Sequence, residues 1–247
     1  MLGLQTLVDV LRASAGTDMA PATSAIIVAA GNSTRMGKNV SKQFLDLDGV
    51  PVLARTLRTF DRVGYIDEII VVTKQEDTDA VHALCERYGI KKPYKIVSGG
   101  DTRAASVANG FAAISPKAKF VAIHDGARCL ITPKMIQKVL RAAYLHKAAT
   151  AACPVTDTVK LVTRHGFIEK TVDRRKVFLA QTPQVFHTDL YRAAVANNKT
   201  LDLTDDNQLI ENIGFPVKVV NCGSDNIKLT HPEDLWRAAA ILEARKK

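Results

Sequence analysis

The sequence has few cysteines, few aromatic residues and no long apolar run. Its 4 cysteines stand at positions 85, 129, 153 and 222, too far apart for a C-x-x-C pair. This spacing argues against a disulfide framework and a zinc site, and it favours reduced, buried thiols. No stretch approaches the ~18 consecutive apolar residues of a membrane-spanning helix. We therefore expect a cytoplasmic protein with no membrane partner.

Lysine and arginine outnumber aspartate and glutamate by 34 to 25, which gives a formal net charge of +9. A surplus of this size is compatible with nucleic-acid binding. The basic residues are scattered, however, and aromatic residues make up only 6% of the chain, so there is no basic helix or base-stacking platform. We expect no nucleic-acid partner and interpret the surplus as typical of an enzyme that handles phosphates.

The first 23 residues differ from the rest of the chain. Apolar residues between positions 4 and 11 have helical spacing, and a stretch rich in alanine, serine and threonine then reads as a linker. Polar residues interrupt the apolar stretch and it lacks a basic start, which disfavours a secretory signal. We predict a disordered N-terminal extension over residues 1–23, with Met19 as an alternative start, and one folded domain over residues 24–247.

Beyond the extension, apolar runs typical of buried strands alternate with amphipathic helical patterns. The predicted strands are 25–29, 68–73, 94–98, 120–124, 150–154 and 217–221. The predicted helices are 51–61, 77–88, 104–114, 133–146, 189–197 and 233–245. This alternation is typical of an α/β fold. We predict a Rossmann-like, mainly parallel, twisted sheet with helices on both faces.

One segment interrupts the alternation of strands and helices. Two short β-type runs, 159–162 and 168–172, flank a His-Gly turn at residues 163–167. This pattern predicts a β-hairpin. Since an isolated hairpin is only marginally stable in water, we expect a protruding arm that packs on a second subunit.

The first predicted strand ends in a loop of small residues, 29–42, that carries Arg35 and Lys42. Small residues let a backbone approach a ligand closely, and N–H groups in such a loop can face phosphate oxygens. Arg35 adds a planar fork of donors and Lys42 adds a point charge. The loop has neither the Gly-Lys-Ser/Thr of a Walker loop nor the G-x-G-x-x-G of a dinucleotide fingerprint. We predict that it binds a nucleoside triphosphate.

Polar segments also follow four further predicted strands, at residues 99–106, 124–128, 155–158 and 222–228. Ligands of open α/β sheets bind beyond the carboxyl ends of the strands, so we expect these segments to meet at one site.

Asp125 follows a buried strand directly and is a candidate magnesium ligand, with Asp225 as the second. A magnesium site needs one or two carboxylates together with phosphate oxygens and water. Asp101 has an equally simple interpretation as a helix N-cap. We interpret His124 as a buried, hydrogen-bonded side chain and not a ligand, and Cys129 as a packed thiol.

These cations and carboxylates indicate phosphoryl-group chemistry, which needs positioning and charge neutralisation more than covalent help. No Ser-His-Asp or Cys-His arrangement is legible in the chain order. We infer transfer at a nucleotide phosphate, with the second substrate as the nucleophile. Two alternatives belong to other classes. A nucleotide-sensing binding module would not need both Arg35 and Lys42, and a nicotinamide dehydrogenase is disfavoured by the missing fingerprint.

Several short motifs follow one another in order between residues 24 and 245. They are Ala-Ala-Gly-x-x-x-Arg-Met-Gly with Ser41-Lys42-Gln43, Gly-Gly-Asp-x-Arg-x-x-Ser at 99–106, His-Asp-x-Ala-Arg at 124–128, Pro-Val-Thr-Asp-Thr at 154–158, Thr-Val-Asp-Arg at 171–174, Gln-Thr-Pro-Gln at 181–184, Thr-Asp-Asp at 204–206 and Asp-Asn-Ile-Lys-Leu-Thr at 225–230. In this order they resemble the 2-C-methyl-D-erythritol 4-phosphate cytidylyltransferase family.

The resemblance implies a magnesium-dependent reaction of non-mevalonate isoprenoid synthesis. A sugar-alcohol phosphate, 2-C-methyl-D-erythritol 4-phosphate, attacks CTP to give CDP-methylerythritol and pyrophosphate. Residues implied as catalytic are Arg35, Lys42, Arg174 and Lys228. Residues implied to hold CTP are Ala29, Ala30, Gly31, Gly100, Asp101 and Ser106. Residues implied to hold the sugar phosphate are Asp125, Arg128, Thr158, Arg174, Thr182 and Lys228.

The hairpin resembles the β-arm of this family, here residues 156–176. The resemblance implies that the arm interlocks two subunits of a homodimer and lends Thr158 and Arg174 to the neighbouring site.

The chain departs from the family pattern at three positions. Ser41 and Cys129 stand where the family usually has proline, and Asn207 stands where a small residue is common. The two missing prolines would leave φ less restricted in loops that need preorganisation. The nearest alternative is a D-ribitol-5-phosphate cytidylyltransferase making CDP-ribitol. Ala127 favours the methylerythritol enzyme, because the ribitol group tends to carry valine there.

Overall fold

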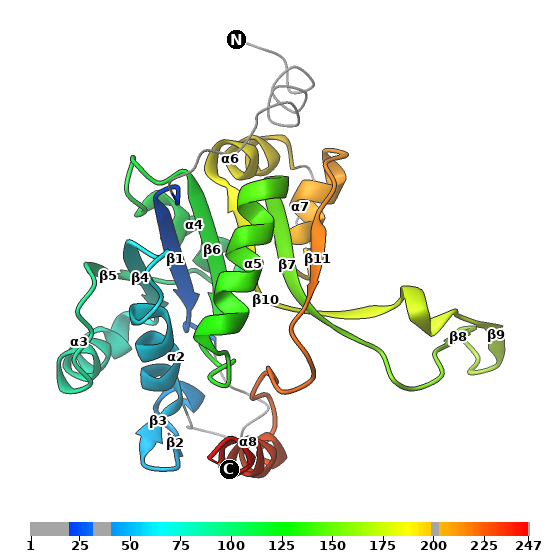
Figure 1. Cartoon of the computed structure of the whole chain (residues 1–247), viewed down its shortest axis with the longest axis horizontal. Coiled ribbons are helices and arrows are strands. Elements are labelled where there is room, and N and C mark those ends of the chain that lie inside the picture. The colour runs from blue at the N-terminus through cyan, green and yellow to red at the C-terminus, as the bar shows by residue number, and fades with distance from the viewer. Residues whose placement is uncertain (1–19, 32–40, 199–202, 247) are drawn as a thin grey trace.

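A computed structural model describes residues 20–31, 41–198 and 203–246 of the chain (Figure 1). Within these residues the centre of the fold is a seven-stranded sheet in the order β11-β7-β10-β6-β1-β4-β5. The strands are β1 Thr23–Val28, β4 Glu68–Thr73, β5 Tyr94–Ser98, β6 Phe120–Asp125, β7 Ala148–Pro154, β10 Phe178–His187 and β11 Lys218–Asn221. All neighbouring pairs are parallel except those of β10, which runs antiparallel to both β6 and β7. The α/β prediction is confirmed.

The central strands are apolar on both faces because helices cover both sides of the sheet. All six residues of β4 are buried. In β1, Ala25 and Ile27 belong to one hydrophobic cluster, whereas Ile26 between them belongs to the other. This period of two is the alternation of side chains along a strand. Most of the predicted extension, residues 1–19, lies outside the described residues, and β1 already begins at Thr23.

The helices form two layers, one on each face of the sheet (Figure 1). The first cluster joins the sheet to α2 Val52–Asp61, α3 Thr78–Arg87 and α5 Pro133–His146. The second joins it to α4 Arg103–Ala112, α6 Thr188–Asn197 and α7 Asn207–Asn212. A third cluster lies under α8 Glu233–Ala244, near the small hairpin of β2 Asp46–Leu47 and β3 Val50–Pro51. Within the described residues, none of the helices is long and apolar enough to cross a bilayer.

Helix α5 shows why local signals predicted some boundaries correctly. Thr132 is its N-cap and accepts a hydrogen bond from the backbone N–H of Met135. Pro133 occupies the first turn, where its missing N–H costs nothing. Lys147 ends the helix in the left-handed region, with φ of 67°. The predicted range, 133–146, is the observed one because these local signals fix both ends.

The predicted hairpin is present as strands β8 Lys160–Val162 and β9 Ile168–Thr171, which pair antiparallel. Gly166 takes a φ of 84° in the turn, a conformation that glycine adopts without strain. The hairpin projects from the body of the domain as a long arm (Figure 1). Apolar side chains on it, Leu161, Phe167 and Ile168, are exposed.

Candidate active site

A cavity of about 640 Å³ lies at the carboxyl edge of the parallel strands. Many of the predicted site residues line it, namely Ala30, Gly31, Lys42, Gly100, Asp101, Ser106, Asp125 and Lys228. They come from the last residue of β6 and from the segments that follow β1, β5 and β11, which lie far apart in the sequence. The prediction that polar strand ends meet at one edge is correct for these four segments. The segment that follows β7 leads into the arm instead.

The loop after β1 is anchored at both ends within the described residues. Ala29, a predicted CTP-holding residue, is buried and does not line the cavity, and its carbonyl accepts a hydrogen bond from the Gln43 amide. Lys42 donates from Nζ to the carbonyl oxygen of Leu229 at 3.2 Å, which joins the end of this loop to the segment after β11. Arg35 belongs to residues 32–40, which lie outside the described residues.

A glycine turn after β5 forms another wall of the cavity. A Cβ atom on Gly99 would lie 2.4 Å from the Cβ of Ala30, so the turn approaches the first loop more closely than any side chain would allow. Ser106 accepts a hydrogen bond from the backbone N–H of Gly100 at 3.1 Å. The N-cap of α4 is Thr102 and not Asp101, which lines the cavity with its side chain exposed.

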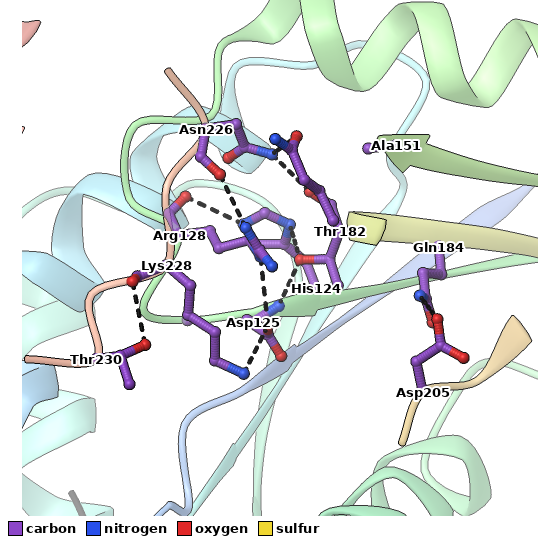
Figure 2. Close-up of polar contacts among 12 residues, drawn as sticks. His124, Asp125, Arg128, Ala151, Thr182, Gln184, Asp205, Asn226, Lys228 and Thr230 are labelled. Carbon is purple, nitrogen blue, oxygen red and sulfur yellow. Dashed lines mark hydrogen bonds and ion pairs between the residues drawn. The ribbon is translucent and has the colours of Figure 1, made fainter. Parts of the chain in front are cut away.

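Three cations surround the carboxylate of Asp125, which is 7% exposed. Lys228 Nζ lies 3.0 Å from Oδ2, Arg128 Nε 3.4 Å from Oδ2, and Arg103 Nε 3.6 Å from Oδ1. Figure 2 shows Lys228 and Arg128 converging on this carboxylate. Burial alone would raise the pKa of Asp125, but Lys228, Arg103 and Arg128 together hold the pKa well below its usual value. The cluster therefore carries net positive charge beside the cavity and suits an anionic ligand.

Thr182 and His124 are buried side chains next to Asp125. The Thr182 hydroxyl accepts a hydrogen bond from the Asp125 backbone N–H at 3.0 Å, and it lies 3.0 Å from Nδ1 of His124. His124 is fully buried, and burial lowers its pKa to about 3. The imidazole is therefore neutral at ordinary pH. The sequence interpretation of a buried, hydrogen-bonded side chain is confirmed. Thr182 holds Asp125 from behind instead of lining the cavity.

We expect His124 to make folding sensitive to mild acid. The unfolded chain takes up a proton near pH 6.5 that the folded chain resists until about pH 3, so stability falls as the pH drops through this range. The loss at pH 5 is about 2 kcal/mol for this one residue. Denaturant unfolding at about pH 7 and about pH 5 measures it, and His124→Gln should shrink the difference by about that amount. An unchanged difference would contradict the buried, neutral histidine, and exposed His82→Gln is the control.

Arg128 and Asn226 connect the site to the segment after β11. Arg128 donates from Nη1 to the carbonyl oxygen of Asn226 at 2.9 Å. Asn226 is completely buried, and its amide donates to the Thr182 carbonyl at 2.9 Å and to Gln181 Oε1 at 3.1 Å (Figure 2). Sequence reasoning assigned Asn226 no role. The only signal was its place in the motif that carries Lys228.

The structure does not bring Asp225 to Asp125. The Asp225 carboxylate is half exposed and pairs with Arg245 at 3.4 Å, and it does not line the cavity. Among the described residues, no cluster of three or more histidine, cysteine, aspartate or glutamate side chains is arranged to hold a metal ion. The packed thiol predicted at Cys129 is confirmed, since this side chain is buried and burial raises its pKa to about 11. Cys85 and Cys222 are buried as well, whereas Cys153 is only partly buried.

The arm projects away from the rest of the domain (Figure 1), and neither Thr158 nor Arg174, which belong to it by sequence, lines the cavity of their own chain. Arg174 begins the short helix η4 Arg174–Lys176, and it donates from Nη1 to the Thr156 carbonyl at 2.6 Å. This hydrogen bond joins the two sides of the arm at its base, outside strands β8 and β9. Within one chain, these two residues are separated from the other predicted site residues.

Residues 23–244 match the family model of IspD, 2-C-methyl-D-erythritol 4-phosphate cytidylyltransferase. A relative of that name from Caldanaerobacter subterraneus subsp. tengcongensis is 46% identical over 224 residues, which cover 89% of this chain and 98% of the relative. Another relative of that name, from Pelotomaculum thermopropionicum, is 42% identical over 226 residues, which cover 90% of this chain and 95% of the relative. The crystal structure of 4-diphosphocytidyl-2C-methyl-D-erythritol synthase from Anaerococcus prevotii superposes with a TM-score of 0.81 at 33% identity, covering 91% of this chain and 97% of that one. The chain belongs to the 2-C-methyl-D-erythritol 4-phosphate cytidylyltransferase family.

Proposed function

We propose that the protein is a cytidylyltransferase that converts CTP and 2-C-methyl-D-erythritol 4-phosphate to CDP-methylerythritol and pyrophosphate. The observation that carries this proposal is the cation cluster on Asp125, at the wall of a cavity that two loops of small residues also line. Such a cavity suits a triphosphate and a second phosphorylated substrate. The family membership of the chain supports the choice of both substrates.

The nucleotide is held largely by backbone groups. The glycine turn at Gly99 and Gly100 and the loop at Ala30 and Gly31 offer N–H groups where no side chain intervenes. Lys42, together with Arg35, neutralises the charge that develops on the α-phosphate as an oxygen of the sugar phosphate attacks and pyrophosphate leaves.

The second substrate lies beside Asp125. Lys228 and Arg128 contact this carboxylate, and a phosphate offers the same bidentate acceptor geometry. Lys228 can therefore move its ammonium from the carboxylate to the phosphate. Asp125 then holds the sugar hydroxyls. Thr158 and Arg174 reach the site from the arm of a second subunit, in a homodimer.

Magnesium enters with the triphosphate in this scheme. Asp125 faces the cavity, but three cations surround its carboxylate, so the described residues fit a divalent ion only where phosphate oxygens supply most of its ligands. When bound, the ion neutralises charge on the triphosphate. We place the reaction in the cytoplasm, where buried thiols stay reduced.

A substrate panel tests the proposal. The enzyme receives CTP and magnesium with 2-C-methyl-D-erythritol 4-phosphate or with D-ribitol 5-phosphate, and pyrophosphate release is measured. We expect kcat/KM for the methylerythritol compound to be higher by about 100-fold, because a site built for one set of hydroxyls leaves groups unpaired with another. Equal efficiency with ribitol phosphate would favour the alternative enzyme. CTP binding without pyrophosphate release would favour a binding module.

A further inference from the structure

Asp206 is a buried carboxylate that three different elements hold in place. Its Oδ2 accepts from Arg103 Nη1 at 2.7 Å, and its Oδ1 accepts from the Tyr191 hydroxyl at 2.8 Å. Its backbone N–H donates to Gln184 Oε1 at 3.0 Å. Asp206 is 4% exposed, so these contacts are shielded from water. Both carboxylate oxygens are therefore fixed, by α4 on one side and by α6 on the other.

Arg103 occupies the first position of α4 and lines the CTP cavity. Its Nη1 is fixed by Asp206, and its Nε faces Asp125 at 3.6 Å. Among the described residues, the structure records no hydrogen-bond partner for Nη2. Burial alone would lower the pKa of Arg103, but Asp206 and Asp125 hold the pKa above its usual value. The guanidinium is thus a fixed, permanently charged group at the cavity wall, next to the N-terminus of a helix.

The turn that carries Asp206 is itself fixed by buried amides. Asn207 donates from Nδ2 to Asp205 Oδ2 at 2.8 Å and to the Thr150 hydroxyl at 3.2 Å. Gln184 donates from Nε2 to the same Asp205 oxygen at 2.8 Å. Figure 2 shows these two side chains next to each other. Gln184 therefore binds both neighbouring acidic residues, one through each atom of its amide. Such a network leaves Asp206 little freedom to follow Arg103 if the arginine moves.

We propose that Arg103 is a further phosphate-binding residue of the CTP cavity and that Asp206, held by Tyr191 and Gln184, is its positioning residue. The inference rests on the proposed function, because it names another contact of the same site. Without Asp206 the guanidinium is free to swing toward Asp125, where it competes with Lys228 and Arg128 for one carboxylate. The cavity then keeps its total cationic charge but loses the fixed orientation of one fork of donors.

The first test compares Asp206→Asn with Asp189→Asn. Asp189 also pairs with an arginine, Arg192 at 2.6 Å, but on the exposed side of α6. We expect Asp206→Asn to weaken CTP binding about tenfold, measured by calorimetry without the second substrate, and to raise KM for CTP equally. KM for the sugar phosphate should change less than KM for CTP. Asp189→Asn should leave all three quantities unchanged, and Tyr191→Phe should weaken CTP binding in the same direction by less.

A double-mutant cycle separates positioning from a merely structural role. If Asp206 acts through Arg103, Asp206→Asn adds no further loss of CTP affinity to Arg103→Gln. The inference is overturned if the two losses multiply, or if Asp206→Asn and Tyr191→Phe lower the melting temperature while CTP affinity stays at the wild-type value. Failure of the proposed function looks different, because wild-type enzyme would bind CTP and release no pyrophosphate with the sugar phosphate. In that case the calorimetric comparison still decides the role of Asp206.

Discussion

Replacing Lys42 with alanine should lower kcat by about 100- to 1000-fold and change the dissociation constant of CTP by less than about tenfold. Lys42 lines the cavity, and its Nζ is held 3.2 Å from the Leu229 carbonyl, so the ammonium is oriented before the substrate arrives. An oriented charge is most effective where negative charge grows, and on CTP that place is the α-phosphate during attack. In the proposed function, by contrast, many backbone groups share the ground-state binding of CTP.

The measurement pairs steady-state kinetics with calorimetric CTP binding in the absence of the sugar phosphate. Lys138→Ala is the matched control, because Lys138 also donates its Nζ to a backbone carbonyl, that of Asn221 at 2.7 Å, but outside the cavity. The control should retain wild-type kcat. If Lys42→Ala weakened CTP binding as much as it slowed turnover, Lys42 would be a binding residue only, and its assignment to the transition state would be wrong.

The strands that sequence reasoning predicted best are the parallel ones at the centre of the sheet. β4 and β5 have the predicted bounds because each is a short apolar run between helices. β10 was missed, although its Val185 and Phe186 are buried on opposite faces of the sheet. Pro183 interrupts the run, and the pairing with β7 shifts register between Ala180 and Gln184. In a strand with a proline and a register shift, apolar and polar residues do not alternate regularly, so the sequence gives no recognisable strand pattern.

The site was predictable to the extent that it depends on strand ends. Parallel strands bring their carboxyl ends to one edge, so Lys42, Asp125 and Lys228 were correctly placed together from chain order alone. Asp225 was grouped with them by sequence proximity, but its side chain turns to Arg245.

The role of Asp206 could not be predicted from strand ends, since Asp206 does not follow a predicted strand and its partner Arg103 lies far away in the sequence. Asn207 appeared only as a departure from the family pattern. In the structure Asn207 has a structural role, since its side-chain amide donates hydrogen bonds to both Asp205 and buried Thr150. Contacts of this kind depend on how α6 and α7 pack on the sheet, which no local pattern records.

The arm poses the remaining question, because it carries two predicted site residues away from the cavity of its own chain. Exposed Leu161, Phe167 and Ile168 would lie in water in an isolated chain, whereas a second subunit would bury them. A symmetric dimer would also return Arg174 to a cavity, that of the partner. The proposed dimer therefore accounts both for the exposed apolar side chains of the arm and for the absence of Arg174 from the cavity of its own chain.

Replacing Arg174 with alanine should raise KM for the sugar phosphate by about 100-fold and leave CTP affinity nearly unchanged, since the loss of a charge-assisted, bidentate phosphate contact is worth about 1.5–3 kcal/mol. Steady-state kinetics and calorimetry measure the two effects. Arg175→Ala is the control, because Arg175 is the exposed neighbour and pairs with Asp173 within the arm. A collapse of CTP affinity in Arg174→Ala would contradict the assignment of the arm.

Mixing two impaired variants then tests whether the arm serves the partner, with activity measured at a sugar-phosphate concentration far below the KM of Arg174→Ala. A heterodimer of Lys42→Ala and Arg174→Ala subunits contains one site with Lys42 intact on its body and Arg174 intact on the arm that reaches it. Random exchange of subunits should therefore restore about one quarter of wild-type activity, because about half of the dimers are mixed and each has one complete site. If each arm served its own chain, every site in the mixture would lack one of the two cations. The mixture would then stay as inactive as its components, and the lent arm would be excluded.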